Sequence, residues 1–344
     1  MVSLNRAKEL LETSVKNGEI PGASFAYITK DGFITDFVGY KQIEPEKIKL
    51  EQGTMYDMAS GTKVVCTTTL VLRLIEEGYF SLKTKVKDIL PDFAFDEITI
   101  LHLLTHTSGM IPDDKNYRKC TNKDEMYEFI NSIPLAYKTG SDLQYSDFGF
   151  IVLGKIIEHY KGNLEEYANE VIFKPLNMTH TMFNPKEKGF ADLCVTEEIQ
   201  EDRGGAIIGE AHDGKAFRMG GVSGNAGLFS TVEDISRFVQ MLLRDGENVL
   251  SPASINLLKT YRTENKPSIR TLGWIANDND ASDGDYYSSK CLYHTGFTGT
   301  SIYVDFERGC GIVLLINAVH PHRGNPHTIS IRNRVHNVIL SEYR

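Results

Sequence analysis

The residues best suited to chemistry are Ser60 and Lys63, which lie three positions apart in the segment Ser-Gly-Thr-Lys. Residues at this spacing share one face of a helical turn, so their side chains are expected to meet. A serine hydroxyl is a poor nucleophile until a base takes its proton, and a lysine amine can be that base if its pKa is lowered. Ser60 is the only serine in the chain with a lysine three positions later. Because so short a pattern also arises by chance, its weight depends on the rest of the chain.

Three further segments bear on this pair. Residues 144–147 (Gln-Tyr-Ser-Asp) precede a predicted helix, residues 294–297 (His-Thr-Gly-Phe) end a predicted strand, and residues 103–109 read Leu-Leu-Thr-His-Thr-Ser-Gly. The order S-x-x-K, then Y-S-x, then H-T-G resembles the serine β-lactamase and penicillin-binding family. The most similar branch holds class C β-lactamases, D-alanyl-D-alanine carboxypeptidases, D-aminopeptidases and related esterases. The resemblance covers nearly the whole chain, and residues 227–234 (Gly-Leu-Phe-Ser-Thr-Val-Glu-Asp) are a further family hallmark.

The resemblance implies a role for each matching residue. Ser60 would attack the substrate carbonyl and become acylated, Lys63 would take or relay its proton, and Tyr145 would share the proton transfer and protonate the leaving group. An exposed lysine is mostly protonated at neutral pH, so burial or neighbouring positive charge must lower its pKa. The residues expected around the substrate are Gly296, which allows close backbone approach, Thr295 and His294, which would contact a carboxylate or polar group, and Phe297, whose N–H would join that of Ser60 in an oxyanion hole.

Two positions depart from the family pattern. Most β-lactamases have lysine where this chain has His294, and histidine is found among peptidases and members that release D-amino acids. The usual asparagine of Y-x-N is Asp147 here. An asparagine amide can donate to a substrate carbonyl, whereas a carboxylate only accepts. Asp147 could instead hold Lys63 in its charged form, which would give Tyr145 more of the base role.

A second set of residues resembles the branch that includes cell-wall muramyl-peptide amidases and related transesterases. It comprises residues 209–213 with His212, residues 219–227, and residues 317–323 with His320 and Arg323. His212, His320 and Arg323 could meet the carboxylate and amide groups of a muramyl-peptide fragment. Asn225 stands where that branch often has histidine, so the match is incomplete.

Structural explanations compete with each assignment. Ser60 could simply cap a helix, Tyr145 could be a core tyrosine, and His294 could be structural. His102 and His106 are four apart, but the glutamate of H-E-x-x-H is missing, so no metal and no cofactor are expected. The odd number of scattered cysteines favours reduced, packed thiols over a disulfide framework; they are Cys66, Cys120, Cys194, Cys291 and Cys310.

Composition is that of a globular protein with a large core. The chain has 344 residues, of which 41% are hydrophobic and 24% charged, and its net charge is -9. This acidity, without a basic run, argues against a nucleic-acid partner. The N-terminus lacks the apolar stretch of a signal peptide, and no apolar run is long enough to span a bilayer. We therefore expect a cytoplasmic protein; the sequence does not indicate its oligomeric state.

Helices and strands are expected in separate parts of the chain. Apolar spacing predicts helices at 3–16 with a Ser3 cap, 61–77, 123–133, 147–160, 163–173, 231–244 and 326–342. Strands are predicted at 22–29, 33–38, 290–294, 301–306 and 311–317, with Asp31-Gly32 turning the first hairpin, and residues 185–225 as a long ordered loop. The resulting α/β (α+β) fold resembles that of the β-lactamases and transpeptidases. It is one unit with an antiparallel sheet lobe (1–58 and 262–344) and an inserted helical lobe (59–261).

The sequence predicts a serine hydrolase that forms an acyl-enzyme on Ser60. The substrate would be a small molecule or peptidoglycan fragment with an amide, peptide, ester or β-lactam bond of cell-wall or D-amino-acid type. Three alternatives remain: a promiscuous carboxylesterase, a penicillin-binding sensor that acylates once, and a catalytically dead binding protein. Amidase, peptidase, esterase and lactamase share this machinery, so the sequence does not separate them.

Overall fold

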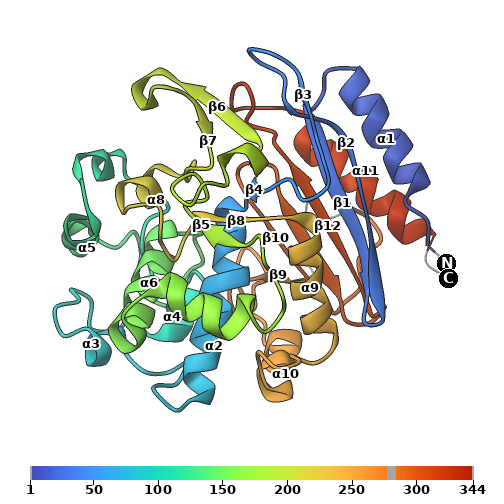
Figure 1. Cartoon of the computed structure of the whole chain (residues 1–344). Helices are drawn as coiled ribbons and strands as arrows, with labels where there is room; N and C mark the ends of the chain where they lie inside the picture. The colour runs from blue at the N-terminus through green and yellow to red at the C-terminus, as the bar shows by residue number, and fades with distance from the viewer. Residues whose placement is uncertain (1, 277–283, 343–344) are drawn as a thin grey trace.

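The computed structural model describes residues 2–276 and 284–342. A seven-stranded sheet, ordered β3-β2-β1-β12-β11-β10-β9, joins strands from both ends of the chain, and all of its strand pairs are antiparallel (Figure 1). This confirms the predicted fold class. The strands are β1 (Gly22–Thr29), β2 (Gly32–Gln42), β3 (Ile48–Lys49), β9 (Ile275–Ala276), β10 (Cys291–Thr295), β11 (Ser301–Asp305) and β12 (Cys310–Ile316).

Helices cover both faces of this sheet. Phe25 of β1 packs in a cluster with residues of α1 (Asn5–Lys16) and α11 (Thr328–Ser341), the two terminal helices. Ala26 and Ile28 of the same strand belong to the other cluster, which includes Phe238 of α9 (Val232–Leu243). Successive strand side chains point to opposite faces, so both faces of β1 are buried in apolar surroundings. The sheet therefore forms the middle layer of this part of the molecule (Figure 1).

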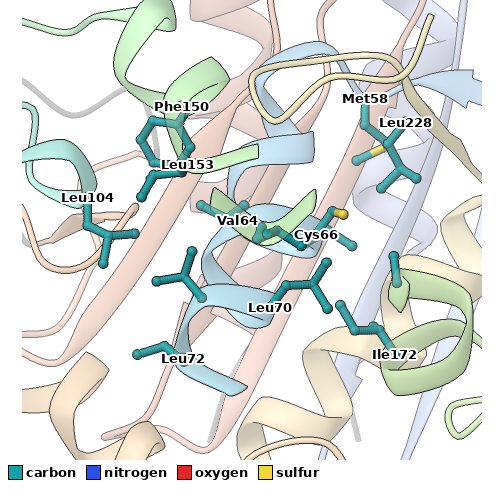
Figure 2. Packing of buried hydrophobic residues seen from close by; sticks show 14 of the residues in the cluster. Met58, Val64, Cys66, Leu70, Leu72, Leu104, Phe150, Leu153, Ile172 and Leu228 are labelled. Atoms are coloured by element: carbon teal, nitrogen blue, oxygen red, sulfur yellow. The ribbon is translucent and has the colours of Figure 1, made fainter. Parts of the chain in front are cut away.

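The helical lobe lies beside the sheet, and the segment carrying Lys63 runs through its core. Val64, Cys66 and Leu70 of this segment are buried among side chains from other helices and from Leu228 (Figure 2). The helices of this lobe are α2 (Thr69–Glu76), α3 (Val86–Ile89), α4 (Ile100–Leu104), α5 (Lys123–Ser132), α6 (Asp147–Lys161), α7 (Leu164–Ala168), α8 (Gly214–Arg218) and α10 (Pro252–Thr260). The lobe boundaries at 58/59 and 261/262 stay a prediction. They do not coincide with the packing everywhere, since α9 lies within 59–261 but packs on the sheet.

Local structure differs from the sequence predictions in several places. The expected helix over 61–77 is a 3-10 turn at Ala59–Gly61, a π-helix at Lys63–Thr68 and then α2. The N-cap of α1 is Leu4, while the Ser3 hydroxyl accepts a hydrogen bond from the Asn5 N–H. The first hairpin turns at residues 30–31, because Gly32 already pairs with Thr29.

The segment 185–225 contains more regular structure than the predicted loop. A hairpin of β6 (Thr196–Gln200) and β7 (Gly205–Ile208) is followed by α8. A separate three-stranded sheet, ordered β4-β8-β5, joins β4 (Tyr56–Asp57), β8 (Leu228–Ser230) and β5 (Met182–Phe183). In the described part of the chain, no helix is both long and apolar enough to cross a membrane.

Candidate active site

The segment that carries Ser60 is fixed from both sides. β4 pairs with β8, and the Met58 N–H continues this pairing by donating to the Leu228 carbonyl at 2.8 Å. Next along the chain, the Ala59 N–H donates to the Asp57 carboxylate at 2.6 Å, and Ala59 has a φ of 45°. A positive φ is strained for a residue with a Cβ and persists only where the surroundings impose it. The turn that presents Ser60 is therefore held by its neighbours.

Ser60 lies between the two side chains that the sequence analysis paired with it. Lys63 Nζ donates to Ser60 Oγ at 2.9 Å, and the Tyr145 hydroxyl donates to the same oxygen at 2.7 Å. The π-helical start at Lys63 places its side chain under the serine. Irregular helical turns of this kind recur at functional sites. The structure thus brings Ser60, Lys63 and Tyr145 together, while their catalytic roles remain predictions.

Lys63 is fully buried and ionically paired. Its Nζ lies 2.8 Å from Asp147 Oδ1 and also donates to the Asn225 carbonyl at 2.8 Å. Burial favours the neutral amine, but the Asp147 carboxylate and Tyr145 more than offset it, so the pKa of Lys63 lies above its usual value. Asp147 therefore contacts the lysine directly, as the sequence analysis considered. At neutral pH this pairing keeps Lys63 protonated.

Aromatic and cationic groups surround the Tyr145 ring. The His106 ring lies 4.5 Å away between centroids, and the Arg270 guanidinium 5.6 Å from the ring centre. His106 Nδ1 accepts the backbone N–H of Ser146 at 3.1 Å, which fixes the start of α6 next to Tyr145. Burial, followed by the charges of Arg270 and Lys63, lowers the pKa of His106 well below its usual value. His106 therefore packs as a neutral ring that positions Tyr145.

His294 lies near the end of β10, the strand end at which the sequence places it. Its side chain is buried, its Nδ1 donates to the Thr295 carbonyl at 3.0 Å, and its Nε2 has no partner among the described residues. Burial, then Arg270 and Lys63, lowers its pKa well below the usual value, so the ring is neutral. It lies behind Tyr145, 6.4 Å between ring centroids, and does not line the cavity described below. The contact of His294 with a substrate carboxylate stays a prediction, and the buried ring with its unpartnered Nε2 does not test it. Thr295 adjoins it at the end of β10.

Gly296 serves packing against the segment of Ser60. A Cβ at this position would lie 2.5 Å from the Met58 carbonyl oxygen and 2.2 Å from Thr300 Oγ1. The glycine is therefore needed where the end of β10 crosses residues 58–59. The sequence analysis explained this glycine by close approach of the substrate, whereas these contacts explain it by close packing within the protein.

We expect Gly296→Ala to lower both stability and activity. Relieving these two contacts must shift backbone, which costs about 1–3 kcal/mol in a packed interior, and the shifted backbone leads directly to Ser60. Urea unfolding and kcat measured on the same preparation check this. Gly32→Ala is the matched control, because nothing lies within 4 Å of its Cβ position. Wild-type stability in Gly296→Ala would contradict the packing role.

An open cavity of about 480 Å³ adjoins Ser60. Phe297, 63% exposed, lines it and stacks on the His212 ring at 5.6 Å. Arg323 and Asp147 also line it, so these sequence-predicted residues share one cavity with Ser60. The cavity wall further includes Pro112, Asp113, Tyr117, Arg118, Gln200, Asp202, Arg203, Asp213, Lys215, Phe217 and Arg218.

Glu198 of β6 links two of the predicted substrate contacts. Its carboxylate accepts from Arg323 Nε and Nη2 at 2.6–2.9 Å and lies 2.9 Å from His212 Nε2. Although burial opposes it, hydrogen bonding by Arg323, Gln200 and His212 lowers the pKa of Glu198 to about 2. His212 and Arg323 are thus held as a unit at the cavity wall.

His320 is turned away from this unit and serves the backbone. Its Nδ1 donates to the Glu197 carbonyl at 2.8 Å, and its Nε2 accepts the N–H groups of Ile43 and Glu44 at 2.9 and 3.2 Å. Both ring nitrogens are therefore used, and the residue does not line the cavity. The expected contact of His320 with substrate stays a prediction, and these hydrogen bonds give the ring a structural role.

The sequence analysis missed Asp57 and Lys215. Asp57 Oδ2 accepts the His212 N–H at 2.8 Å, which ties the nucleophile segment to the loop before α8, and burial raises its pKa to about 6. Lys215 Nζ lies 3.1 Å from the second oxygen of Asp147. The only signal for Lys215 was its position two residues after the quoted 209–213 motif.

The remaining candidates have structural surroundings. His102 Nδ1 accepts the Thr99 N–H in a helix cap, and the five cysteines are buried free thiols. In residues 2–276 and 284–342, no cluster of three or more metal-ligand side chains forms a metal site.

Comparison with known proteins places this arrangement in a family. The model of the family described as β-lactamase matches residues 7–335. This chain belongs to the β-lactamase family. An N-acetylmuramyl-L-alanine amidase of Bacillus subtilis (strain 168) is 32% identical, with 92% of this chain and 81% of the relative covered. A protein of Escherichia coli (strain K12), provisionally named a D-alanyl-D-alanine carboxypeptidase, is 33% identical over 82% of this chain and 73% of its own length.

Solved structures of other proteins share the fold. The octameric penicillin-binding protein homologue from Pyrococcus abyssi has a TM-score of 0.80 at 22% identity, covering 98% of this chain and 78% of that one. EstCE1, a hydrolase with promiscuous acyltransferase activity, has a TM-score of 0.78 at 20% identity, covering 96% and 97%. These likenesses support the fold, and the family makes the chain a serine hydrolase.

Proposed function

We propose that this family member hydrolyses an amide bond of a peptidoglycan fragment through an acyl-enzyme on Ser60. The observation that carries the proposal is the position of Ser60 Oγ, 2.9 Å from Lys63 Nζ and 2.7 Å from the Tyr145 hydroxyl at the wall of an open cavity. One partner can take the serine proton while the other delivers a proton to the leaving group. The names of the Bacillus and Escherichia relatives support an amide of cell-wall type.

The reaction follows from these contacts. Ser60 Oγ forms a bond to the substrate carbonyl carbon as its proton passes to neutral Lys63 or through Tyr145. The bond from that carbon to the leaving nitrogen then breaks, and the nitrogen takes the proton. Water hydrolyses the resulting ester, which releases the acid and returns a proton to Ser60. The Ser60 and Phe297 N–H groups remain the proposed donors to the carbonyl oxygen, and each such donor contributes about 3 kcal/mol to the transition state.

The charges on the cavity wall favour a substrate that bears carboxylates. Arg118 and Arg218 line the cavity, and neither has a carboxylate partner within the described residues; Arg218 donates only to the Cys120 carbonyl at 3.2 Å. Arginine is well suited to binding carboxylate in a fixed orientation. Peptidoglycan peptides carry such groups, whereas simple esters do not. Arg118 and Arg218 are accordingly the proposed carboxylate contacts on this wall, whereas Arg323 is already paired with Glu198.

A four-substrate comparison tests the proposal. The protein is incubated separately with N-acetylmuramyl-L-alanine, a D-alanyl-D-alanine peptide, benzylpenicillin and p-nitrophenyl acetate, and both intact protein mass and small-molecule products are followed. We expect kcat/KM to be highest for one of the two cell-wall amides. Turnover of the ester alone would favour a carboxylesterase. A stable penicillin adduct without any turnover would favour a sensor, and opened penicillin a lactamase.

A further inference from the structure

Lys215 of α8 is a second buried lysine beside the site. Its side chain is 6% exposed, and its Nζ lies 3.0 Å from Asp113 Oδ1, 3.1 Å from Asp147 Oδ2 and 3.6 Å from Asp213 Oδ2. The rings of Tyr117 and Phe148 cover it at 4.8 and 6.0 Å. A buried lysine with this many carboxylates around it is held as an ammonium.

Asp147 bridges two ammonium groups. Its Oδ1 lies 2.8 Å from Lys63 Nζ and its Oδ2 lies 3.1 Å from Lys215 Nζ. The bridge closes into a ring of contacts, because Asp213 accepts from Asn225 Nδ2 at 3.1 Å and the Asn225 carbonyl accepts from Lys63. Two routes of contacts therefore connect Lys63 and Lys215, one through Asp147 and one through Asp213 and Asn225.

A lone carboxylate beside Lys63 would oppose the proposed chemistry. Neutral Lys63 would leave a buried, unpaired charge on Asp147, and such a charge is costly in an interior. With Lys215 in place, Asp147 keeps an ionic partner after Lys63 loses its proton. Taken by itself, the pair of Asp147 and Lys215 carries no net charge, like the asparagine that stands at this position in the pattern Y-x-N, while Lys215 also faces the carboxylates of Asp113 and Asp213.

We propose that Lys215 is a positioning residue that balances the charge of Asp147 and thereby lets Lys63 give up its proton to act on Ser60. This inference rests on the proposed acyl-enzyme function. This role of Lys215 accounts for the aspartate at position 147. Asp147 and Lys215 together take the place of the uncharged asparagine in the pattern Y-x-N.

The other groups around Lys63 do not supply this balance. Tyr145 and the Asn225 carbonyl contact it, while His106 and His294 are neutral rings. Arg270 is cationic, but its guanidinium lies over the Tyr145 ring, 5.6 Å from the ring centre. Among the described residues, Asp147 forms ion pairs only with Lys63 and Lys215.

A direct role for Lys215 in substrate binding is the competing explanation. Its three donor positions face Asp113, Asp147 and Asp213, and its side chain is almost inaccessible. Asp213 is itself fixed, since its Oδ1 accepts the N–H groups of Lys215 and Ala216 at 3.1 and 2.8 Å. A substrate carboxylate would have to displace one of these partners.

The test is a double-mutant cycle on Lys215 and Asp147. It compares the pH dependence of kcat/KM for the uncharged substrate p-nitrophenyl acetate, in which the acid limb is the part where activity rises with pH. Lys215→Met should move the acid limb to higher pH by about one unit or more, because Asp147 then holds the Lys63 proton alone. Asp147→Asn should move it to lower pH. The double variant removes the carboxylate that pairs with Lys63 together with its lysine partner, so its profile should lie closer to wild type than that of Lys215→Met.

Further variants separate charge balance from folding. Lys215→Arg keeps the charge and should keep the acid limb within about 0.5 pH units of wild type. Lys259→Met is the matched control, because Lys259 of α10 forms an ion pair with Asp245 away from the cavity. Thermal unfolding is recorded for each variant. If Lys215→Met does not fold, Lys215→Gln and the double variant carry the same comparison.

Three results would overturn the inference: an unshifted limb in Lys215→Met, a double variant no closer to wild type, or a rise in KM confined to carboxylate-bearing substrates. These results are distinct from failure of the proposed function, in which wild-type protein would hydrolyse neither of the two cell-wall amides, whatever its pH profile with p-nitrophenyl acetate.

Discussion

Ser60→Ala is expected to lower turnover of every substrate by about 10⁴- to 10⁶-fold, the range for removing the nucleophile of a serine hydrolase. The hydroxyl oxygen accepts from both Lys63 and Tyr145, so the alanine variant keeps the base and loses the atom that forms the bond. Intact mass after mixing with benzylpenicillin or p-nitrophenyl acetate should show an adduct on the wild-type protein and none on the variant. A burst of p-nitrophenol should disappear together with it.

A loss of this size has to be separated from a loss of structure. Ser236→Ala is the matched control, because its buried hydroxyl donates to the Val232 carbonyl within α9, away from the cavity. Both variants should unfold within about 1–2 kcal/mol of wild type, since each loses one hydrogen-bonding hydroxyl. An adduct on Ser60→Ala, or turnover within tenfold of wild type, would mean that another residue is the nucleophile.

The sequence could pair Ser60 with Lys63 from local spacing, and it added Tyr145 only through the family resemblance that the order of the motifs carries. Ser60 and Lys63 are three residues apart, so almost any helical turn brings their side chains together. The antiparallel sheet was predictable for a similar reason, because alternation and turn residues are local signals. The π-helix at Lys63–Thr68 was not, since helical periodicity does not distinguish it from an α-helix.

The histidines show where sequence reasoning ended. His320 and His212 have the same side chain and both stand in motif-like segments, but long-range packing gives them opposite surroundings. His320 receives N–H groups from residues 43 and 44, more than 270 positions earlier, whereas His212 stacks on Phe297 at the cavity. Lys215 gave no signal beyond its nearness to the 209–213 motif, because Asp113 and Asp147 reach it from distant segments of the chain.

Lys63→Met is expected to lower kcat/KM by about 10²- to 10⁴-fold, the usual contribution of a general base. Methionine fills much of the buried volume without the amine, and Asp147 keeps its contact with Lys215 at 3.1 Å. The variant should therefore remain folded, in contrast to a variant that leaves a buried carboxylate without any partner. Thermal unfolding and the rate of acyl-enzyme formation, measured on the same protein, check both parts of this expectation.

The pH profile of the same variant decides between Lys63 and Tyr145 as the base. The raised pKa of Lys63 means that the neutral amine becomes more abundant as pH rises, so wild-type kcat/KM should increase toward alkaline pH. If Lys63 takes the serine proton, this increase should be absent in Lys63→Met. If the increase persists and activity stays within tenfold of wild type, Lys63 acts by holding Ser60 in place, and Tyr145→Phe should cause the larger loss. The ion pair with Asp147 would then keep Lys63 permanently charged, and Tyr145, whose hydroxyl lies 2.7 Å from Ser60 Oγ, would be the remaining group in reach of the proton.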